Sequence, residues 1–329
     1  MFTNGLFGHI LVEMGEQVAV GREKRRGAAV HVGTCGWTDK TLLESGEFYP
    51  DRRMSAEDRL RFYAANFDTV EVDSTFYALP SEKVVGLQVE RTPTDFTLHY
   101  KAFGLLTRHS VDPKRLPRAV KELLPPELLE LSRLYPRDVP EEAARLVWRM
   151  FASALSPAKN AGKLGVVLFQ FPPYFTYSEP HKEYVLYCRD RLRGHRLAVE
   201  FRHNSWTEAN RLEEVLEWLR DHDLIYTAVD EPQFPGGKTV PPLAATTADI
   251  SYIRLHGRNR ENWYKKNITV AERYAYEYSD EELGHWVNKI ELISPFTSEV
   301  YVMFNNCFRN FAVKNAGRMA NLLERSRGV

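Results

Sequence analysis

Charged and amide side chains recur at alternating positions in short β-rich segments whose other residues are apolar. The segment RLAVEFRHNSW, residues 196–206, shows this pattern clearly. Leu197, Val199 and Phe201 suit a buried strand, whereas Glu200 and Arg202 alternate with them. Because successive strand side chains point to opposite faces, Glu200 and Arg202 share one face. The question is whether that face meets water or an interior shared with other polar residues.

Other segments place polar residues on the corresponding face. Ionised groups removed from water cost several kcal/mol each, so a shared interior requires mutual pairing, water or a ligand. The opposite face, which includes Thr227 and Val229, is expected to meet helices. The polar set is Glu71, Asp73 and Thr75; His99 and Lys101; Gln170; Glu200 and Arg202; Asp230; Arg254 and His256; and Asn305.

Five members of this set are candidate catalytic residues: Lys101, Glu200, Asp230, Glu71 and His256. Carboxylates and imidazole transfer protons. The lysine has two interpretations. It is an ion-pair member if carboxylates hold its proton, or a Schiff-base nucleophile if burial and a neighbouring cation lower its pKa.

Cations and aromatic residues also alternate in the loops that follow the fifth, seventh and eighth segments. The stretch HGRNRENWYKKN, residues 256–267, is an example. Such loops suit phosphates with stacked bases, and they suit a sugar phosphate in the same way. A solvated charged loop is the alternative. The candidate phosphate- or substrate-binding residues are Arg202, His203, Trp206, Arg254, Arg258, Trp263, Tyr276, Asn305 and Asn306.

Eight β-rich segments, mostly separated by helical patterns, must position these residues. Strands that alternate with helices favour parallel pairing, and eight such units predict a (β/α)8 TIM barrel in the α/β class. A doubly wound open sheet is the alternative. In a barrel the selected residues lie mostly toward the C-terminal strand ends, which form the catalytic face. The segments are residues 30–37, 69–76, 96–103, 164–171, 196–203, 224–231, 251–258 and 299–306.

The chain divides into an N-terminal arm, residues 1–29, and one barrel domain, residues 30–325. The arm is expected to be flexible or to cap the barrel. Residues 105–163 are long for one connection and predict a helical insertion after the third strand. Long loops after barrel strands carry function or cover a site, although packing on the outside is the alternative.

Composition narrows the class of protein. The 329 residues contain 44 lysines and arginines and 44 aspartates and glutamates, so no global charge attracts nucleic acid or membrane. Three scattered cysteines and no signal-peptide pattern fit a reducing cytoplasm. No apolar run approaches the roughly 18 residues of a membrane helix. Neither a Gly-rich phosphate loop nor a GxSxG elbow occurs.

No cofactor is expected, and a metal is left open as an alternative. Imidazole and carboxylate ligands suit zinc or manganese. No tight ligand spacing supports such a site, and Arg202 and Arg254 would repel a cation. The residues available as ligands are His203, His256, Glu200, Asp230 and Glu71.

A set of longer motifs resembles the YecE-like proteins, known as domain of unknown function 72, from about residue 30 to 325. The resemblance implies a TIM barrel similar to that of endonuclease IV, a metal-dependent enzyme acting at abasic DNA sites. Family members typically have Ser in place of Cys35 and Gly near Asn310. The motifs are GTCGW (33–37), FYP (48–50), FDTVEVDSTFYALP (67–80), TPTDFTLHYKA (92–102), VLFQFPP (167–173), VEFRHNSW (199–206), YIRLHGRN (252–259), YEYSDEEL (276–283) and FNNCFRNFAVKNA (304–316).

Three functions follow from these observations. The first is an enzyme acting on nucleic acid at damaged or abasic sites, a lyase or endonuclease in DNA repair. The second is a small-molecule enzyme acting on a phosphorylated or carboxylated sugar. The third is a non-catalytic barrel that binds an anion or nucleic acid. All three expect an anionic ligand, and none involves a membrane. The oligomeric state stays open.

Overall fold

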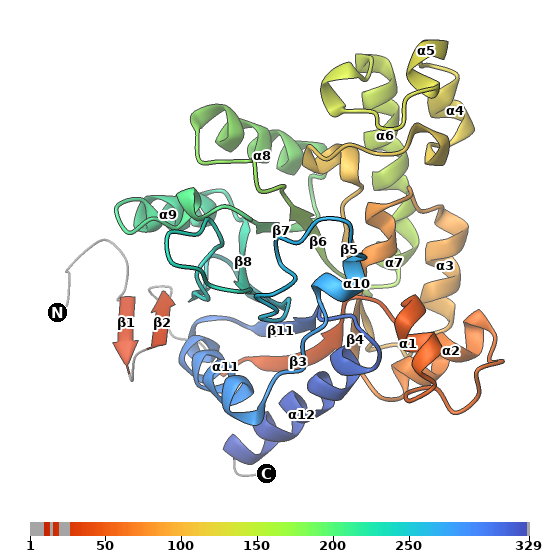
Figure 1. Ribbon diagram of the computed structural model, residues 1–329. Helices are drawn as coiled ribbons and strands as arrows, with labels where there is room; N and C mark the ends of the chain where they lie inside the picture. Colours follow the sequence, from red (N-terminus) through yellow and green to blue (C-terminus); the bar gives the residue numbers. More distant parts are fainter. Residues whose placement is uncertain (1–9, 14–15, 20–26, 328–329) are drawn as a thin grey trace.

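Eight parallel strands close into a barrel in the computed structural model, which describes residues 10–13, 16–19 and 27–327 (Figure 1). Each strand falls within one of the eight predicted segments or within one residue of it, so the TIM barrel is confirmed. The barrel order is β10-β11-β3-β4-β5-β6-β7-β8. The strands are β3 (Ala29–Thr34), β4 (Thr69–Val72), β5 (Thr97–Lys101), β6 (Leu164–Gln170), β7 (Arg196–Glu200), β8 (Ile225–Asp230), β10 (Ile250–Leu255) and β11 (Glu299–Phe304).

Helices surround the barrel, and their starts follow local capping chemistry. Ser55 and Ser279 each accept a hydrogen bond from a backbone amide of the first turn, in complete capping boxes with Asp58 and Glu282. The helices outside residues 105–163 are α1 (Lys40–Ser45), α2 (Ala56–Ala64), α3 (Glu82–Glu90), α8 (Glu179–Arg191), α9 (Leu212–Asp221), α10 (Val270–Arg273), α11 (Asp280–Ile293) and α12 (Phe311–Ser326).

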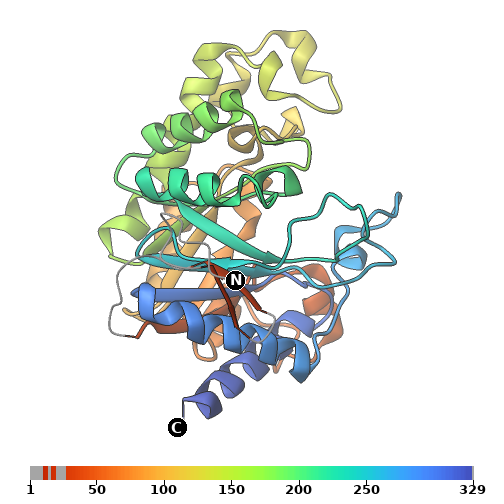
Figure 2. The same cartoon turned by 90° about the vertical axis from the view of Figure 1, so that its left-hand side faces the viewer.

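Residues 105–163 project from one side of the barrel as a group of short helices (Figures 1 and 2). Prolines restrict the first half to single turns, because proline cannot continue a helix interior. The one long helix, α6, buries Val147, Trp148 and Phe151 on one face. The elements are η2 (Gly104–Thr107), η3 (Pro113–Arg115), α4 (Arg118–Lys121), α5 (Pro126–Leu129), η4 (Pro136–Asp138), α6 (Glu141–Ala154) and α7 (Ser156–Asn160).

Part of the N-terminal arm forms a small sheet. Strands β1 (Ile10–Glu13) and β2 (Glu16–Ala19) are antiparallel, and β2 pairs in parallel with β9 (Ala244–Ala245). Val18 and Ala19 are buried, so this part packs on the barrel. The expectation of flexibility for residues 1–9, 14–15 and 20–26 falls outside the described residues. Within the described part of the chain, no helix is long and apolar enough to cross a membrane.

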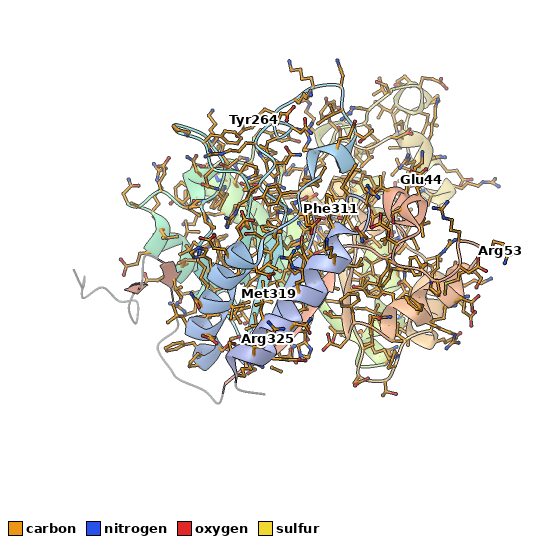
Figure 3. The ribbon with its side chains drawn as sticks, turned by 60° about the horizontal axis from the view of Figure 1, so that its bottom comes forward. Glu44, Arg53, Tyr264, Phe311, Met319 and Arg325 are labelled. Atoms are coloured by element: carbon orange, nitrogen blue, oxygen red, sulfur yellow. The ribbon has the colours of Figure 1, made fainter. Side chains whose placement is uncertain are left out.

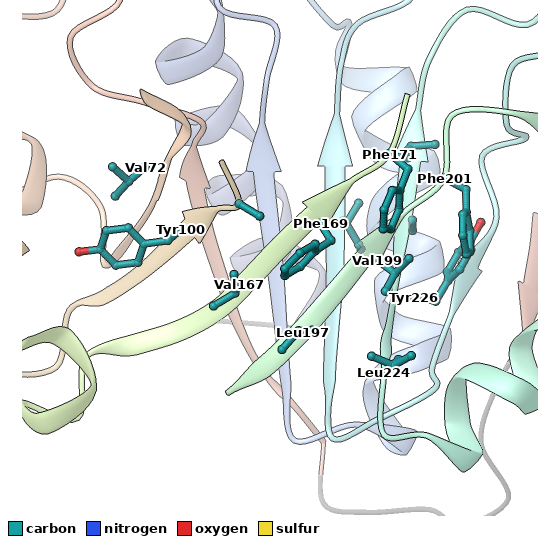
Figure 4. Packing of buried hydrophobic residues seen from close by; sticks show 14 of the residues in the cluster. Val72, Tyr100, Val167, Phe169, Phe171, Leu197, Val199, Phe201, Leu224 and Tyr226 are labelled. Atoms are coloured by element: carbon teal, nitrogen blue, oxygen red, sulfur yellow. The ribbon is translucent and has the colours of Figure 1, made fainter. Parts of the chain in front are cut away.

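The core has two layers. Between strands and helices lies a large apolar layer that contains Phe169, Val199 and Phe201 (Figure 4). The lower lumen holds a second cluster with Val166, Leu168, Ala198, Ile225 and Tyr252 among its members. The upper lumen holds the polar network described below.

Strand β8 faces the opposite way from the prediction, as its pairing with β10 shows. Tyr252 lies in the lumen and pairs with Thr227, whereas Leu255 lies in the outer layer and pairs with Asp230. Paired residues of parallel strands point to the same side. Thr227 and Val229 therefore face the lumen and Asp230 faces the helices. The sequence of β8 does not indicate which face meets the lumen, because both faces consist mainly of apolar residues.

Gly33 lies where the backbones of β3 and β4 approach each other closely. A Cβ on Gly33 would lie 2.3 Å from the carbonyl oxygen of Thr69, and a backbone atom cannot move aside as a side chain can. We expect Gly33→Ala to lower the free energy of unfolding by about 1–3 kcal/mol or more, measured by urea denaturation. The control is Gly284→Ala in α11, where nothing lies within 4 Å, and this change should stabilise. Equal effects of the two changes would contradict the close approach.

Candidate functional site

A fully buried arginine occupies the centre of the upper lumen. The Arg254 Nε and Nη2 atoms donate to the two carboxylate oxygens of Glu71, at 2.9 and 2.7 Å, and Nη1 donates to Glu200 at 2.6 Å. All three side chains are fully buried. Burial alone would lower the pKa of Arg254, but Glu200 and Glu71 raise it well above its usual range. Arg254 is therefore a structural cation and not a free phosphate ligand.

Glu200 is the second centre of the same network. Its Oε1 accepts from Gln170 Nε2 at 2.6 Å and contacts His256 Nε2 at 3.0 Å. Burial opposes ionisation, but Arg254 and His256 lower the pKa of Glu200 well below its usual range. Glu200 is therefore a permanent anion within the network rather than a proton carrier.

His256 is neutral and fully enclosed. Burial lowers its pKa to about 3 against the charge of Glu200. Asn305 Nδ2 lies 2.8 Å from His256 Nδ1, so the remaining ring proton lies on Nε2 and points to Glu200. The imidazole connects Asn305 to the buried anion and is not a free base.

An open cavity of about 840 Å³ lies above this network, at the C-terminal ends of the strands. Lys101 lines it and donates to Asp73 Oδ1 at 2.7 Å, with its Nζ 4.5 Å from the centre of the Phe76 ring. Burial lowers the pKa of Lys101, but Asp73 helps to raise it above the usual value overall. Of the two interpretations of Lys101, the protonated ion-pair member is the one that fits this geometry.

A second carboxyl on the cavity has an unusual protonation state. Asp39 follows β3 in the loop before α1 and lines the cavity. Burial and the charge of Asp73 raise the pKa of Asp39 to about 7. Gly36, with φ +112°, lies directly against it, since a Cβ there would be 2.9 Å from Asp39 Oδ2. The loop thus holds a carboxyl that exchanges its proton near neutrality.

Arg202 connects the network to the cavity wall. Its guanidinium pairs with Glu231 Oε2 at 3.0 Å and with Glu200 Oε1 at 3.4 Å, and its centre lies 5.4 Å from the centre of the Trp263 ring. Burial raises the pKa of Glu231 to about 7 against the opposing effect of Arg202. Trp263 and Tyr274, both from the loop after β10, meet edge to face on the wall.

Three predicted residues lie outside the barrel. Asp230 accepts from Trp286 Nε1 of α11 at 2.5 Å and from Arg258 Nη2 at 2.7 Å. Arg258 also donates to Glu282, as does the Tyr276 hydroxyl. The prediction that Asp230 joins the lumen was wrong, because the strand that carries it has the opposite orientation. Arg258 and Tyr276 belong to this outer cluster.

Three further candidate residues lie away from the cavity and make structural contacts instead. Trp206 is fully buried, stacks on Phe201 at 4.1 Å between ring centres, and donates Nε1 to the Phe175 carbonyl, so it cannot stack on a base. Asn306 is fully buried and donates to the Tyr276 carbonyl. His203 is half-buried, bonds Ser205 through Nδ1, and does not line the cavity.

The cavity contains four of the predicted site residues: Lys101, Arg202, Trp263 and Asn305. Asp73 and Gln170 belonged to the polar set without being selected, and Asp39 was missed. No group of three or more histidines, cysteines, aspartates or glutamates among the described residues could hold a metal ion. Of the ligands considered, Glu71 and Glu200 are bound to Arg254, and Asp230 points away.

Comparisons with known proteins agree with the fold. A family model described as protein of unknown function DUF72 matches residues 31–329. UPF0759 protein YunF of Bacillus subtilis is 28% identical, over 90% of this chain and 95% of its own. A DUF72 structure from Thermotoga maritima has 30% identity and TM-score 0.70, covering 90% and 99% of the two chains. One from Enterococcus faecalis has 22% identity and TM-score 0.72, covering 90% and 95%.

The buried network predicts a large cost for removing its cation. Arg254→Met leaves Glu71 and Glu200 buried without their main counter-charge. We expect the free energy of unfolding to fall by about 3–5 kcal/mol in urea denaturation. The control, Arg53→Met, removes an arginine whose side chain is 91% exposed and should change stability little. A cost below about 1 kcal/mol for Arg254→Met would show that the network does not stabilise the barrel.

Asp39 predicts a pH-dependent difference in stability. Its folded pKa, about 7, lies above the ordinary value of 3.8, so its contribution to stability is lost as pH rises through 7. Asp39→Asn should therefore melt above the wild type at pH 8, by an amount on the order of 2–4 °C, and the difference should shrink at pH 5. Exposed Asp221→Asn is the control. A difference independent of pH would contradict the raised pKa.

Proposed function

The chain belongs to the DUF72 family, and for this member we propose that the mouth cavity is the active site of an enzyme that uses general acid–base catalysis on a sugar-like ring. The observation that carries the proposal is Asp39. It is a carboxyl on the cavity whose pKa is raised to about 7 beside the ion-paired Asp73. A carboxyl of raised pKa beside a carboxylate held in an ion pair provides a general acid and a candidate general base.

The division of labour follows from the two environments. Asp73 is paired with the Lys101 ammonium and carries a negative charge that can accept a proton. Asp39 carries its proton below about pH 7 and can donate it to a leaving or carbonyl oxygen. Lys101 would orient Asp73 and balance its charge. The buried network below supplies a rigid floor and no mobile proton.

The walls support a ring-shaped, hydroxyl-bearing ligand. The cavity is lined by the aromatic rings of Phe76, Trp263 and Tyr274. The polar side chains of Arg202 and Asn305 line it beside them, although both are also bonded to the buried network. About 840 Å³ is within the range of small-molecule sites. Apolar walls with few polar groups fix the orientation of such ligands. A phosphate clamp is less supported, because Arg254 is bound by two carboxylates and Arg258 lies outside the barrel.

Nucleic acid is the second candidate substrate, with the DNA repair, lyase and endonuclease activities predicted from the sequence. The cavity would then accept one nucleotide turned out of its strand. An imine mechanism through Lys101 finds no support, because Asp73 holds the ammonium protonated. Acid–base cleavage by Asp39 and Asp73 requires no free amine, so it is the version that we retain.

The test is a panel of aryl glycosides, free aldoses and ketoses, sugar phosphates and single-stranded oligonucleotides with and without an abasic site, screened for binding by ligand-observed NMR and then for turnover. We expect turnover of at least one class to fall as pH rises above about 7, where Asp39 loses its proton. Asp39→Asn should lower kcat about 10²–10⁴-fold, whereas Asp221→Asn should not. If no member of the panel reacts, or if Asp39→Asn retains full activity, the proposal fails.

A further inference from the structure

A pair of exposed tyrosines at the edge of the cavity suggests what the sugar-like ring is part of. We infer that a single-stranded nucleic acid lies across this edge, with one nucleotide in the cavity and its neighbours stacked on Tyr174 and Tyr135. The assignment of the cavity nucleotide rests on the proposed function. The stacking surface stands on its own geometry, which makes it testable without catalysis.

The exposed rings of Tyr174 and Tyr135 form a platform, in which the Tyr174 ring is held in place by a hydrogen bond. Tyr174, in the loop after β6, is 62% exposed, and its hydroxyl donates to the Arg108 carbonyl at 2.6 Å. Tyr135, from the insertion, is 40% exposed, and its ring has the Arg137 guanidinium 5.0 Å from its centre. Arg108, whose carbonyl accepts the Tyr174 bond, lines one pocket together with Pro136, which directly follows Tyr135 in the chain, so the two tyrosines lie on adjoining segments. The bond to Arg108 holds the Tyr174 ring while leaving it open to solvent.

The platform is continuous with the cavity. Pro173, which directly precedes Tyr174, lines the cavity, and so does His109, which directly follows Arg108. Tyr77 and Tyr264, 44% and 61% exposed, lie on other parts of the cavity lining. Figure 3 shows Tyr264 at the opposite end of the molecule from Arg325 of α12. Exposed aromatic residues therefore begin in the cavity and extend onto the insertion.

The charge of the insertion is complementary to phosphate. Residues 105–163 contain eleven lysines and arginines against seven aspartates and glutamates, a net charge of +4 in a chain that is neutral overall. Arg108, Arg133 and Arg137 lie at or beside the platform, and all three are exposed. Two acids oppose them: Asp138, 3.7 Å from Arg137, and Glu183, which shares a pocket lining with Arg108.

This combination fits single-stranded nucleic acid better than a free sugar phosphate or a sulfated polysaccharide. A free sugar phosphate fits within the cavity and leaves the platform unused. A sulfated polysaccharide uses the cations but has no π face for the tyrosines. Unpaired bases stack on aromatic side chains while cations follow the backbone, which uses both features. A duplex hides its bases and would lose the stacking contribution.

The experiment measures binding of a fluorescent single-stranded oligothymidylate of about 12 nucleotides by anisotropy, at low and moderate salt. We expect binding at low salt that weakens as salt rises. Tyr174→Ala should weaken it about tenfold, and Tyr174→Phe, which keeps the ring, should retain most of it. Arg137→Ala should weaken binding and flatten the salt dependence. Arg53→Ala, on an exposed arginine before α2, is the matched control and should bind as the wild type does.

Three results would overturn the inference. They are no binding at low salt, equal binding by Tyr174→Ala, and binding of duplex or heparin that equals that of the single strand. The last would indicate charge attraction without stacking. Because the readout is binding, failure of the acid–base proposal is recognised separately. Absence of turnover together with Tyr174-dependent binding would reject the catalytic role of Asp39 and keep the surface.

Discussion

A cation that water cannot reach organises the upper half of this barrel. Arg254 from β10 spans the lumen to Glu71 of β4 and Glu200 of β7, and all three side chains are fully buried. Isolated charges in such a place cost several kcal/mol each, so the three must remain together. Their contacts connect strands that are not neighbours in the barrel. The positions of Gln170, His256 and Arg202 follow, since each of them completes the hydrogen bonding of Glu200.

The charges within the buried network balance one another, so the groups that can exchange protons lie at its edge. The groups that remain responsive are carried on the segments that follow the strands. Asp39 lies in the loop after β3 and Glu231 directly after β8. Burial raises the pKa of both carboxyls to about 7. A stiff interior with titrating groups at its rim is the usual arrangement of barrel enzymes, in which loops vary on a constant frame.

The sequence predicts the frame well and the loops poorly, for physical reasons. Alternation identified the lumen side of most strands, because polar residues there contrast with apolar neighbours. It failed for β8, where Tyr226 and Ala228 are as apolar as Thr227 and Val229. Trp206 resembled a rim residue because only the fold reveals its aromatic stack. Asp39 gave no signal, since its contacts come from residues distant in the chain and from Gly36.

The insertion gives a neutral protein an uneven field. Residues 105–163 carry +4 and project from one side, so the remainder of the chain carries −4 (Figure 2). Such a separation is a permanent electric dipole, and a polyanion approaching from solution would turn the molecule before touching it. The protein would meet such a partner with its insertion first. Its encounter rate would therefore depend on ionic strength even though its net charge is zero.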